Sequence, residues 1–419
     1  MAGQPGEPAA ARRLTGSSET PREKRRKAGA MPTVQPPPNP MAELQNRWYN
    51  AVLKNLPASP STAQLIQPAP LVELSDIKLW ARENVVPPAS LTFDRQLAES
   101  TSFFDEYTTV IQELSVPEST LVAAIGSGVH QEWLAYVRGL TPQPGEDRLP
   151  DVFYAWAMTH HPDIANEGAS VLRDIVRLRA LQRFLRSYQG PPPKPAEYLG
   201  GIRELLSLLR NSSSATISFD STTTSGDVSG TWTRGVNKDF SGLWSGADQF
   251  DTTTTGFARS VVTVKAELGA YALWAVNPDP CWYDSSQLHV AYTKQTIPPW
   301  ASNPRLYWDM AFGEKSGRLQ RAIASLIVVE RLRSVVTSDA VFSPEDQQVI
   351  KAKAAAGLWP FFVPTGDGVT NNAEFDGGKL RLETTTPMDR PLVIGAHVLP
   401  IARYLGASRI APRAGTDRY

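Results

Sequence analysis

The chain has very little cysteine, no excess of one charge and no long apolar run. Its 419 residues contain a single cysteine, Cys281, so we expect neither a disulfide-stapled scaffold nor a cysteine-rich zinc module. Lys and Arg together number 42, as do Asp and Glu. The net charge therefore gives no reason to expect binding to nucleic acid or to an anionic membrane. No uninterrupted stretch of about 18 apolar residues occurs, so no membrane-spanning helix is expected.

The chain does contain enough apolar material for sizeable cores. Hydrophobic residues make up 41% of it, with 11 Trp, 14 Phe and 12 Tyr, which excludes wholesale disorder. Its length exceeds what one hydrophobic core usually holds. The sequence therefore predicts an α+β protein with an irregular α-helical domain over residues 41–210. A mainly antiparallel β-rich domain with inserted helices, a sheet or a sandwich, is predicted over 211–419.

Residues 1–40 differ in composition from the rest of the chain. They contain no Trp, Tyr or Phe and end in a proline-rich run, so we expect a disordered basic tail. Two basic clusters in it are spaced as in a bipartite nuclear import signal, namely Arg12, Arg13, Lys24, Arg25, Arg26 and Lys27. The sequence thus favours an intracellular, cytoplasmic protein, or a nuclear one in a eukaryote. Alternatively, the tail is simply solvated, or translation starts at Met31 or Met41 instead of Met1.

Apolar residues three and four positions apart recur between residues 41 and 210. With proline-rich breaks between them, they predict helices over residues 41–55, 75–84, 94–115, 118–140, 150–161, 164–188 and 196–210. In the helix over 164–188 an apolar stripe accompanies several arginines. Arg173, Arg177 and Arg183 are therefore candidates for a surface that contacts a partner or a membrane. The plainer alternative is that these arginines face water or pair with nearby acids.

The composition changes after Arg210. Between residues 211 and 260, 20 of 50 residues are Ser or Thr and six are Gly, which favours strands joined by turns. Period-two alternation predicts a hairpin of 216–220 with 228–233, and further strands at 262–268, 270–276, 325–337, 379–384 and 392–399. Helices are predicted over 316–325 and from Ser343, where a serine cap precedes a proline.

The hydroxyl-rich strands allow a second interpretation. Paired amphipathic strands can close into a membrane pore, and residues 213–234 or 250–268 are long enough to cross a bilayer. Several aspartates lie among these residues, and exposed threonine is ordinary on any antiparallel sheet. A pore-forming or membrane-associated protein is therefore a minor alternative.

The densest group of reactive residues surrounds the one cysteine. Cys281, Asp284 and His289 are weak candidates for a nucleophile, an orienting acid and a base, because catalytic Cys and His usually meet through the fold and not along one loop. The adjacent His160 and His161 lack the spacing of a zinc motif, so a helix-end role is expected. Nucleotide and hydrolase motifs are absent, and we expect no cofactor and no metal site.

These observations favour a non-catalytic binding protein of unknown protein or small-molecule partner, with no nucleic acid on the folded body. Besides the arginines, the candidate contact residues are loop aromatics, because exposed Trp and Tyr concentrate binding energy; they are Trp232, Trp244, Trp282, Tyr283 and Trp300. The first alternative is an enzyme or accessory factor that acts on a small apolar metabolite in a pocket between the two halves.

Overall fold

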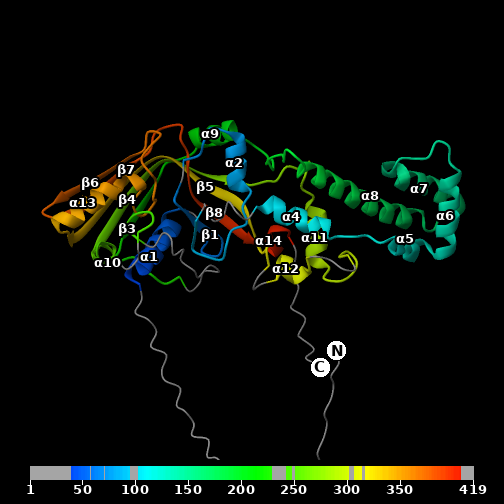
Figure 1. Cartoon of the computed structure of the whole chain (residues 1–419), viewed down its shortest axis with the longest axis horizontal. Coiled ribbons are helices and arrows are strands. Elements are labelled where there is room, and N and C mark those ends of the chain that lie inside the picture. Colours follow the sequence, from blue (N-terminus) through cyan, green and yellow to red (C-terminus); the bar gives the residue numbers. More distant parts are fainter. Residues whose placement is uncertain are drawn as a thin grey trace, which may run out of the picture. The chain divides into compact units, whose positions relative to one another are not determined.

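The computed structural model describes residues 39–56, 58–69, 71–94, 102–228, 242–247, 251–301, 306–313 and 317–406. The expected disordered tail, with its two basic clusters, lies outside this part of the chain. The described residues form an α+β fold with helices throughout the N-terminal half and one mixed sheet of eight strands (Figure 1). The predicted fold class is confirmed.

Both halves of the described chain contain helices and strands. The α-helices are α1 (Pro40–Asn55), α2 (Asp76–Glu83), α4 (Phe103–Gln112), α5 (Glu118–Ile125), α6 (Ser127–Gly139), α7 (Leu149–His160), α8 (Ala165–Tyr188), α9 (Ile202–Arg210), α10 (Thr252–Arg259), α11 (Ser285–Thr293), α12 (Trp308–Phe312), α13 (Pro344–Lys353) and α14 (Ile401–Tyr404). The strands are β1 (Ala63–Gln67), β2 (Thr92–Asp94), β3 (Ala215–Asp220), β4 (Val262–Ala275), β5 (Arg321–Val341), β6 (Thr370–Asp376), β7 (Lys379–Thr385) and β8 (Leu392–Pro400).

Strand β5 lies at the centre of the sheet. The hydrogen-bonded order is β2, β1, β8, β5, β4, β3. Strand β7 also pairs with β5, and β6 pairs with β7. Strand β4 runs along one side of β5, while β8 and β7 share its other side. The strand pairs are antiparallel except for β1 with β2, so the prediction of a mainly antiparallel sheet is confirmed.

Gly269 of β4 and Arg331 of β5 lie opposite each other where the pairing of these two long strands is interrupted. We call this interruption the crease. Leu268 pairs with Leu332 and Ala270 with Glu330, but the position between them carries no ladder pair. Arg331 has a φ of 54°, a left-handed conformation that is rare outside glycine, and its Nη2 donates to the carbonyl of Gly269 at 2.8 Å. A Cβ at residue 269 would lie 2.8 Å from the Cβ of Arg331, so only glycine fits there.

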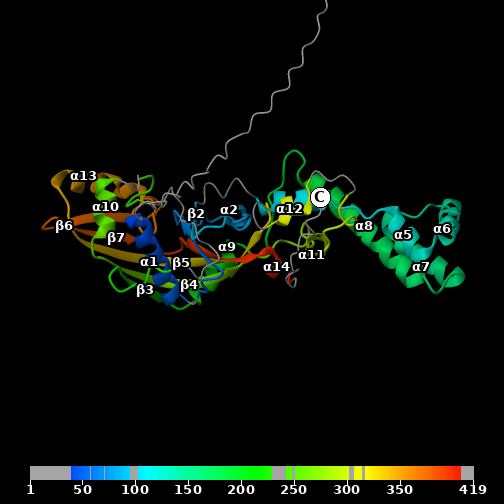
Figure 2. The same cartoon turned by 90° about the horizontal axis from the view of Figure 1, so that it is seen from below.

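On β4 the crease separates buried residues of two hydrophobic cores, whereas on β5 beyond the crease neighbouring residues alternate between them. Leu268 belongs to one core, while Ala270, two positions further along the same strand, belongs to the other. The first, which we name the α1 core, includes Trp48, Phe219, Phe257, Ile327 and Trp359. The second, the α4 core, includes Phe104, Tyr107, Trp274, Trp282 and Leu326. Figures 1 and 2 show α1, α10 and α13 over the part of the sheet that forms the α1 core.

A third core lies among helices away from the sheet. This α7 core consists of side chains from α5 to the first half of α8, including Trp133, Phe153, Trp156, Ala169 and Leu172. The second half of α8 contributes Leu178 and Leu185 to the α4 core instead. One helix therefore connects the two cores, and Figure 1 shows α5, α6 and α7 gathered around its N-terminal part.

The expected single helix over 118–140 is two helices. They meet at Gly126, which has a φ of 84°, a conformation that glycine adopts without strain. Further along the chain, the helix expected over 316–325 is wrong, because β5 begins at Arg321 and pairs with β4 and β8. Alanine and leucine favour a helix locally. Pairing between two neighbouring strands outweighs this local preference in the residues from Arg321 onward.

The threonine-rich segment before β4 is also not a strand. Thr252–Arg259 forms α10, whose cap Asp251 accepts a hydrogen bond from the backbone nitrogen of Thr254 at 3.3 Å. The expected strands at 262–268 and 270–276 are the single strand β4, and β3 pairs with it. Residues 229–233, the expected partner of β3, lie outside the described part of the chain.

Two strands of the N-terminal half escaped the sequence prediction. Strand β1 is buried along its whole length and pairs with β8 on one side and β2 on the other. The N-terminal half therefore contributes two strands to the same sheet as the residues after 210. A separate domain on each side of residue 210 stays a prediction.

Candidate functional site

The three catalytic candidates do not form a nucleophile, base and acid set. Asp284 caps α11 by accepting hydrogen bonds from the backbone nitrogens of Ser286 and Gln287 at 3.0 and 3.3 Å. Its other oxygen pairs with Nε of Arg177 at 2.6 Å. His289 Nδ1 lies 3.3 Å from the carbonyl of Leu405. Asp284 and His289 are thus held by structural partners, and neither has a described hydrogen bond with the thiol of Cys281.

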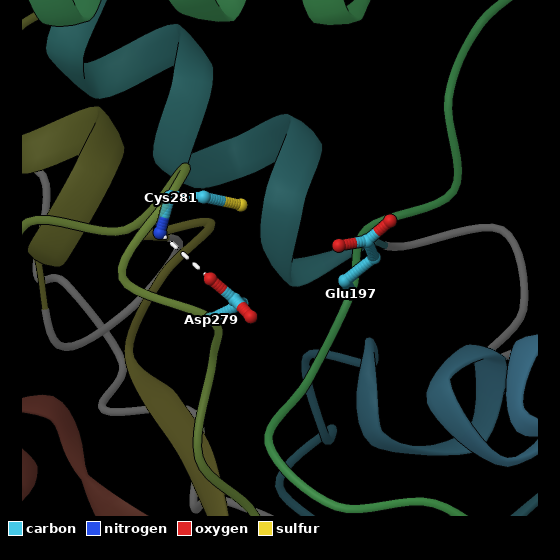
Figure 3. Close-up of side chains that lie close together, drawn as sticks. All are labelled: Glu197, Asp279 and Cys281. Atoms are coloured by element: carbon cyan, nitrogen blue, oxygen red, sulfur yellow. Dashed lines mark hydrogen bonds between the residues drawn. The ribbon is translucent and has the colours of Figure 1, made fainter.

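Cys281 lies instead beside two other acids, Glu197 and Asp279. The backbone nitrogen of Cys281 donates to Oδ1 of Asp279 at 2.8 Å. One ligand atom from each of the three side chains lies within 4.8 Å of the other two. Figure 3 shows the Glu197 side chain extending from its own loop toward the turn that carries Asp279 and Cys281. Among the described residues, this is the one place where three potential metal ligands meet.

Backbone contacts hold the two loops of this cluster together. The carbonyl of Glu197 accepts hydrogen bonds from the backbone nitrogen of Asp279 at 3.1 Å and from Nε1 of Trp282 at 2.7 Å. The nitrogen of Leu199 donates to the carbonyl of Asn277 at 2.8 Å. Because Trp282 is fully buried in the α4 core, it anchors the turn of Cys281, and the cluster lies where two loops are joined by hydrogen bonds.

The cluster keeps its thiol protonated. Partial burial, a hydrogen bond with the Asp279 carboxylate and the charge of Glu197 raise the pKa of Cys281 to about 11. A thiolate is the form that attacks substrates and binds metals, so this environment opposes both roles at neutral pH. Two carboxylates and a thiolate could hold a borderline cation such as Zn²⁺, but only after losing that proton.

Two of the three contact candidates on α8, Arg177 and Arg183, form intramolecular pairs. Besides Arg177 with Asp284, both Arg179 and Arg183 contact Glu146, at 3.2 and 2.7 Å. Burial alone would raise the pKa of Glu146, but these two guanidinium groups lower it below its usual value. Arg173 is exposed. The arginines thus face water or pair with acids of the same chain, as the alternative interpretation predicted. Their role in contacting a partner stays a prediction.

The loop aromatics are core residues where the structure describes them. Trp244, Trp282 and Trp300 are each less than a tenth exposed, and Tyr283 packs against the α4 core. The expected contact surface therefore cannot rest on these three tryptophans, because their faces are covered by neighbouring side chains. Trp232 lies outside the described residues.

A polar hollow lies between α1 and β3. Its volume is about 770 Å³, and its lining is mainly polar, with Asn50, Lys54, Asn55 and Asp220 among the side chains. It contains residues from both halves of the chain, as the enzyme alternative expects, but its lining does not suit an apolar metabolite. None of the catalytic candidates lines it. An enzyme of this kind stays a prediction.

A buried carboxyl group that sequence reasoning missed lies at the end of α2. Glu83 is 1% exposed, and its Oε1 accepts a hydrogen bond from Nε1 of Trp274 at 2.7 Å. Its Oε2 has no hydrogen-bond partner among the described residues. Burial raises the pKa of Glu83 to about 8, so the group is mostly protonated at neutral pH.

The exposed face of α7 is a second feature that sequence reasoning missed. Phe153, Trp156 and Ala157 point into the α7 core, while Tyr154 and Met158 are 38% and 48% exposed. The segment from Val152 to Met158 is apolar on every side of the helix, which is the pattern of a fully buried helix. The apolar residues on every side of this helix were the sequence signal for the exposed apolar face. They did not indicate which kind of partner would bind it.

The C-terminal end of α7 is fixed by polar contacts. His160 Nδ1 lies 2.8 Å from the carbonyl of Trp156, and the two rings stack with centroids 5.5 Å apart. His161 ends the helix and its Nε2 lies 2.7 Å from a carboxylate oxygen of Glu132. The expected helix-end role of these histidines agrees with this geometry.

No described helix combines the length and the apolar composition needed to cross a bilayer. Neither a protein-family model, nor a curated protein, nor a solved structure matches this chain.

Proposed function

We propose that this chain is a non-catalytic interaction protein that binds another protein surface through the exposed face of α7. The single observation that carries the proposal is that α7 has the apolar composition of a buried helix while Tyr154, Ala155 and Met158 face solvent. Scattered exposed apolar residues are ordinary. A contiguous apolar face on one helix is typical of a binding site.

Residue spacing makes this face continuous. Tyr154 and Met158 are four positions apart, so their side chains are neighbours on the helix surface. Ala155 lies beside Met158 on the same exposed side, and the charged residue of this face is Asp151, one turn nearer the N-terminus. Tyrosine and methionine are enriched in protein interfaces, whereas they are uncommon on free surfaces.

The face is held rigidly from behind. Trp156 stacks between Tyr136 and His160, with ring planes 26° and 22° apart, and Trp133 packs edge-on against Phe153 with centroids 5.0 Å apart. Such preorganisation lowers the entropy cost of binding, because few side chains need to be fixed when a partner arrives. The protonated Cys281 thiol and the structurally committed Asp284 support a non-catalytic role.

A position-specific cross-link tests this function. The photoreactive residue benzoylphenylalanine replaces Tyr154 in one variant and Val349 of α13 in another, because Val349 is similarly exposed, at 42%, on a different helix. In the cells from which the sequence comes, we expect illumination to give a covalent protein adduct at position 154 and none at position 349. Equal adduct yields at the two positions, or none at either, would overturn the proposal.

A further inference from the structure

We infer that a pocket between α4, the end of α8 and α12 binds a free α-amino acid with an apolar side chain. The volume of the pocket is about 300 Å³, at the lower end of the range for small-molecule sites. Its lining combines one arginine, one acid, uncharged polar groups and two apolar side chains. None of the described lining residues belongs to α7, so the inference goes beyond the proposed function and does not depend on it.

Hydrogen bonds fix the walls of this pocket. Nε2 of Gln182 in α8 donates to the carbonyl of Leu114 at 2.8 Å, and Nε2 of Gln112 in α4 donates to the carbonyl of Gln182 at 2.9 Å. At α12, the backbone nitrogen of Arg318 donates to the carbonyl of Met310 at 3.0 Å. The backbone around the pocket is therefore in place before a ligand arrives, which lowers the entropy cost of binding.

Polar atoms at the pocket lack hydrogen-bond partners among the described residues. Thr108 lines the pocket and is 1% exposed, and its Oγ1 has no such partner. The guanidinium of Arg318 also forms no hydrogen bond with the described residues. Its Nη1 lies 3.9 Å from Oε2 of Glu106, which is too far for one, and this Oε2 is itself buried without a partner. Because buried polar groups are nearly always hydrogen-bonded, these atoms point to a polar ligand in the pocket.

The charges at the pocket suit a ligand that carries both signs. The guanidinium of Arg318 matches the geometry of a carboxylate, which it binds through two parallel hydrogen bonds. Glu113 lines the pocket, and Glu106 lies beside Arg318, so an ammonium group of the ligand also meets opposite charge. Burial raises the pKa of Glu106 although the charge of Arg318 lowers it. A second cation beside this carboxyl would stabilise its ionised form.

The apolar part of the lining accounts for the side chain of the ligand. Leu306 is 3% exposed and Met310 is 43% exposed, and both line the pocket. A methionine adapts its shape to an apolar group that packs against it. A small molecule with a carboxylate, an ammonium group and an apolar side chain is an α-amino acid of the size of leucine or methionine. A simple amine or a simple carboxylic acid would match the charges on only one part of the pocket.

Isothermal titration calorimetry of the full chain with L-leucine and L-methionine tests the inference. We expect saturable binding of one molecule per chain. L-Leucinamide, which lacks the carboxylate, and N-acetyl-L-leucine, which lacks the ammonium group, should each bind at least about tenfold more weakly. Arg318→Met and Thr108→Val should also weaken the binding of leucine, by about tenfold and severalfold. The exposed Arg138→Met on α6 is the control and should bind as the wild type does. Circular dichroism establishes that each variant remains folded.

Three results would overturn the inference. The first is that neither amino acid binds at millimolar concentration. The second is that leucine, its amide and its acetyl derivative bind equally well, since the site would then recognise neither charge. The third is that folded Arg318→Met or Thr108→Val binds leucine with wild-type affinity, because the amino acid would then occupy another place. The cross-link at position 154 reports on α7 and not on this pocket, so the proposed function and this inference can fail separately.

Discussion

Nε1 of Trp274 donates a hydrogen bond of 2.7 Å to the carboxyl group of Glu83, and this pair joins α2 to β4 inside the α4 core. The carboxyl is the acceptor in a place where water does not reach it, since Glu83 is 1% exposed. A protonated acid can occupy such a place, whereas a carboxylate without a cation beside it is strongly disfavoured.

The stability of the protein should consequently fall as pH rises. The pKa of Glu83 is about 8 when folded against 4.5 for an ordinary glutamate, so between these values the folded state binds more protons than the unfolded state. The stabilisation is fully present below about pH 4.5 and is lost as pH rises through 8. The loss corresponds to at most about 5 kcal/mol.

Glu83→Gln keeps an acceptor for Trp274 and cannot ionise. We expect this variant to be more stable than the wild type at pH 9, with a flatter dependence of the free energy of unfolding on pH in urea titrations. The exposed Glu374→Gln serves as the control and should follow the wild type. A Glu83→Gln curve parallel to that of the wild type between pH 5 and 9 would refute the burial argument.

Gly168 should not tolerate a side chain. It lies in α8 where a Cβ would come within 2.3 Å of the Phe153 ring, so Gly168→Ala overpacks the α7 core. We expect a loss of about 1–3 kcal/mol in the free energy of unfolding. Gly256→Ala is the matched control, because Gly256 is also helical and nothing lies within 4 Å of its added Cβ. That control should gain up to about 1 kcal/mol.

Cys281 should react slowly despite its exposure. Its pKa of about 11 leaves far less thiolate at pH 7.5 than in an unperturbed thiol. We expect alkylation by iodoacetamide to be roughly 10- to 100-fold slower than that of a cysteine in a short peptide, as measured by mass spectrometry over time. Asp279→Asn combined with Glu197→Gln should accelerate the reaction, while Asp376→Asn should not. A wild-type rate equal to that of the peptide would contradict the raised pKa.

The arginines of α8 should prove structural. Arg177→Glu combined with Arg183→Glu removes the pairs with Asp284 and Glu146. Both arginines are more than half exposed, so we expect a loss of at most about 1 kcal/mol per pair without unfolding. The adduct yield at position 154 should stay unchanged. A folded double variant that no longer forms the adduct would instead favour the arginine face as the contact surface.

Local patterning predicted many of the elements. The alternation in Val262–Leu268 and in Lys379–Thr384 identified strands whose inward residues are buried. The sequence from Ser343 identified α13, since Oγ of Ser343 accepts a hydrogen bond from the nitrogen of Asp346 at 3.1 Å. In these elements the local preference and the tertiary environment agree, which is why periodicity alone was sufficient.

Other elements depend on contacts that no local pattern encodes. Strand β1 contains two buried glutamines, Gln64 and Gln67, which fit only because their amides donate to the carbonyls of Pro88 and Pro360. The approach of Glu197 to Cys281 likewise depends on the pairing of two distant loops. The α7 face was visible as an all-round apolar helix, but its exposure depends on how α5, α6 and α8 surround the other side.

The crease at Gly269 and Arg331 has a consequence for how the molecule melts. Strands β4 and β5 both run through it, and each supplies side chains to the α1 core and to the α4 core. If either core unfolds, β4 and β5 lose part of their packing, and these same strands also build the other core. Calorimetry should accordingly show a single cooperative transition for the two cores, because thermal unfolding of one core destabilises the other.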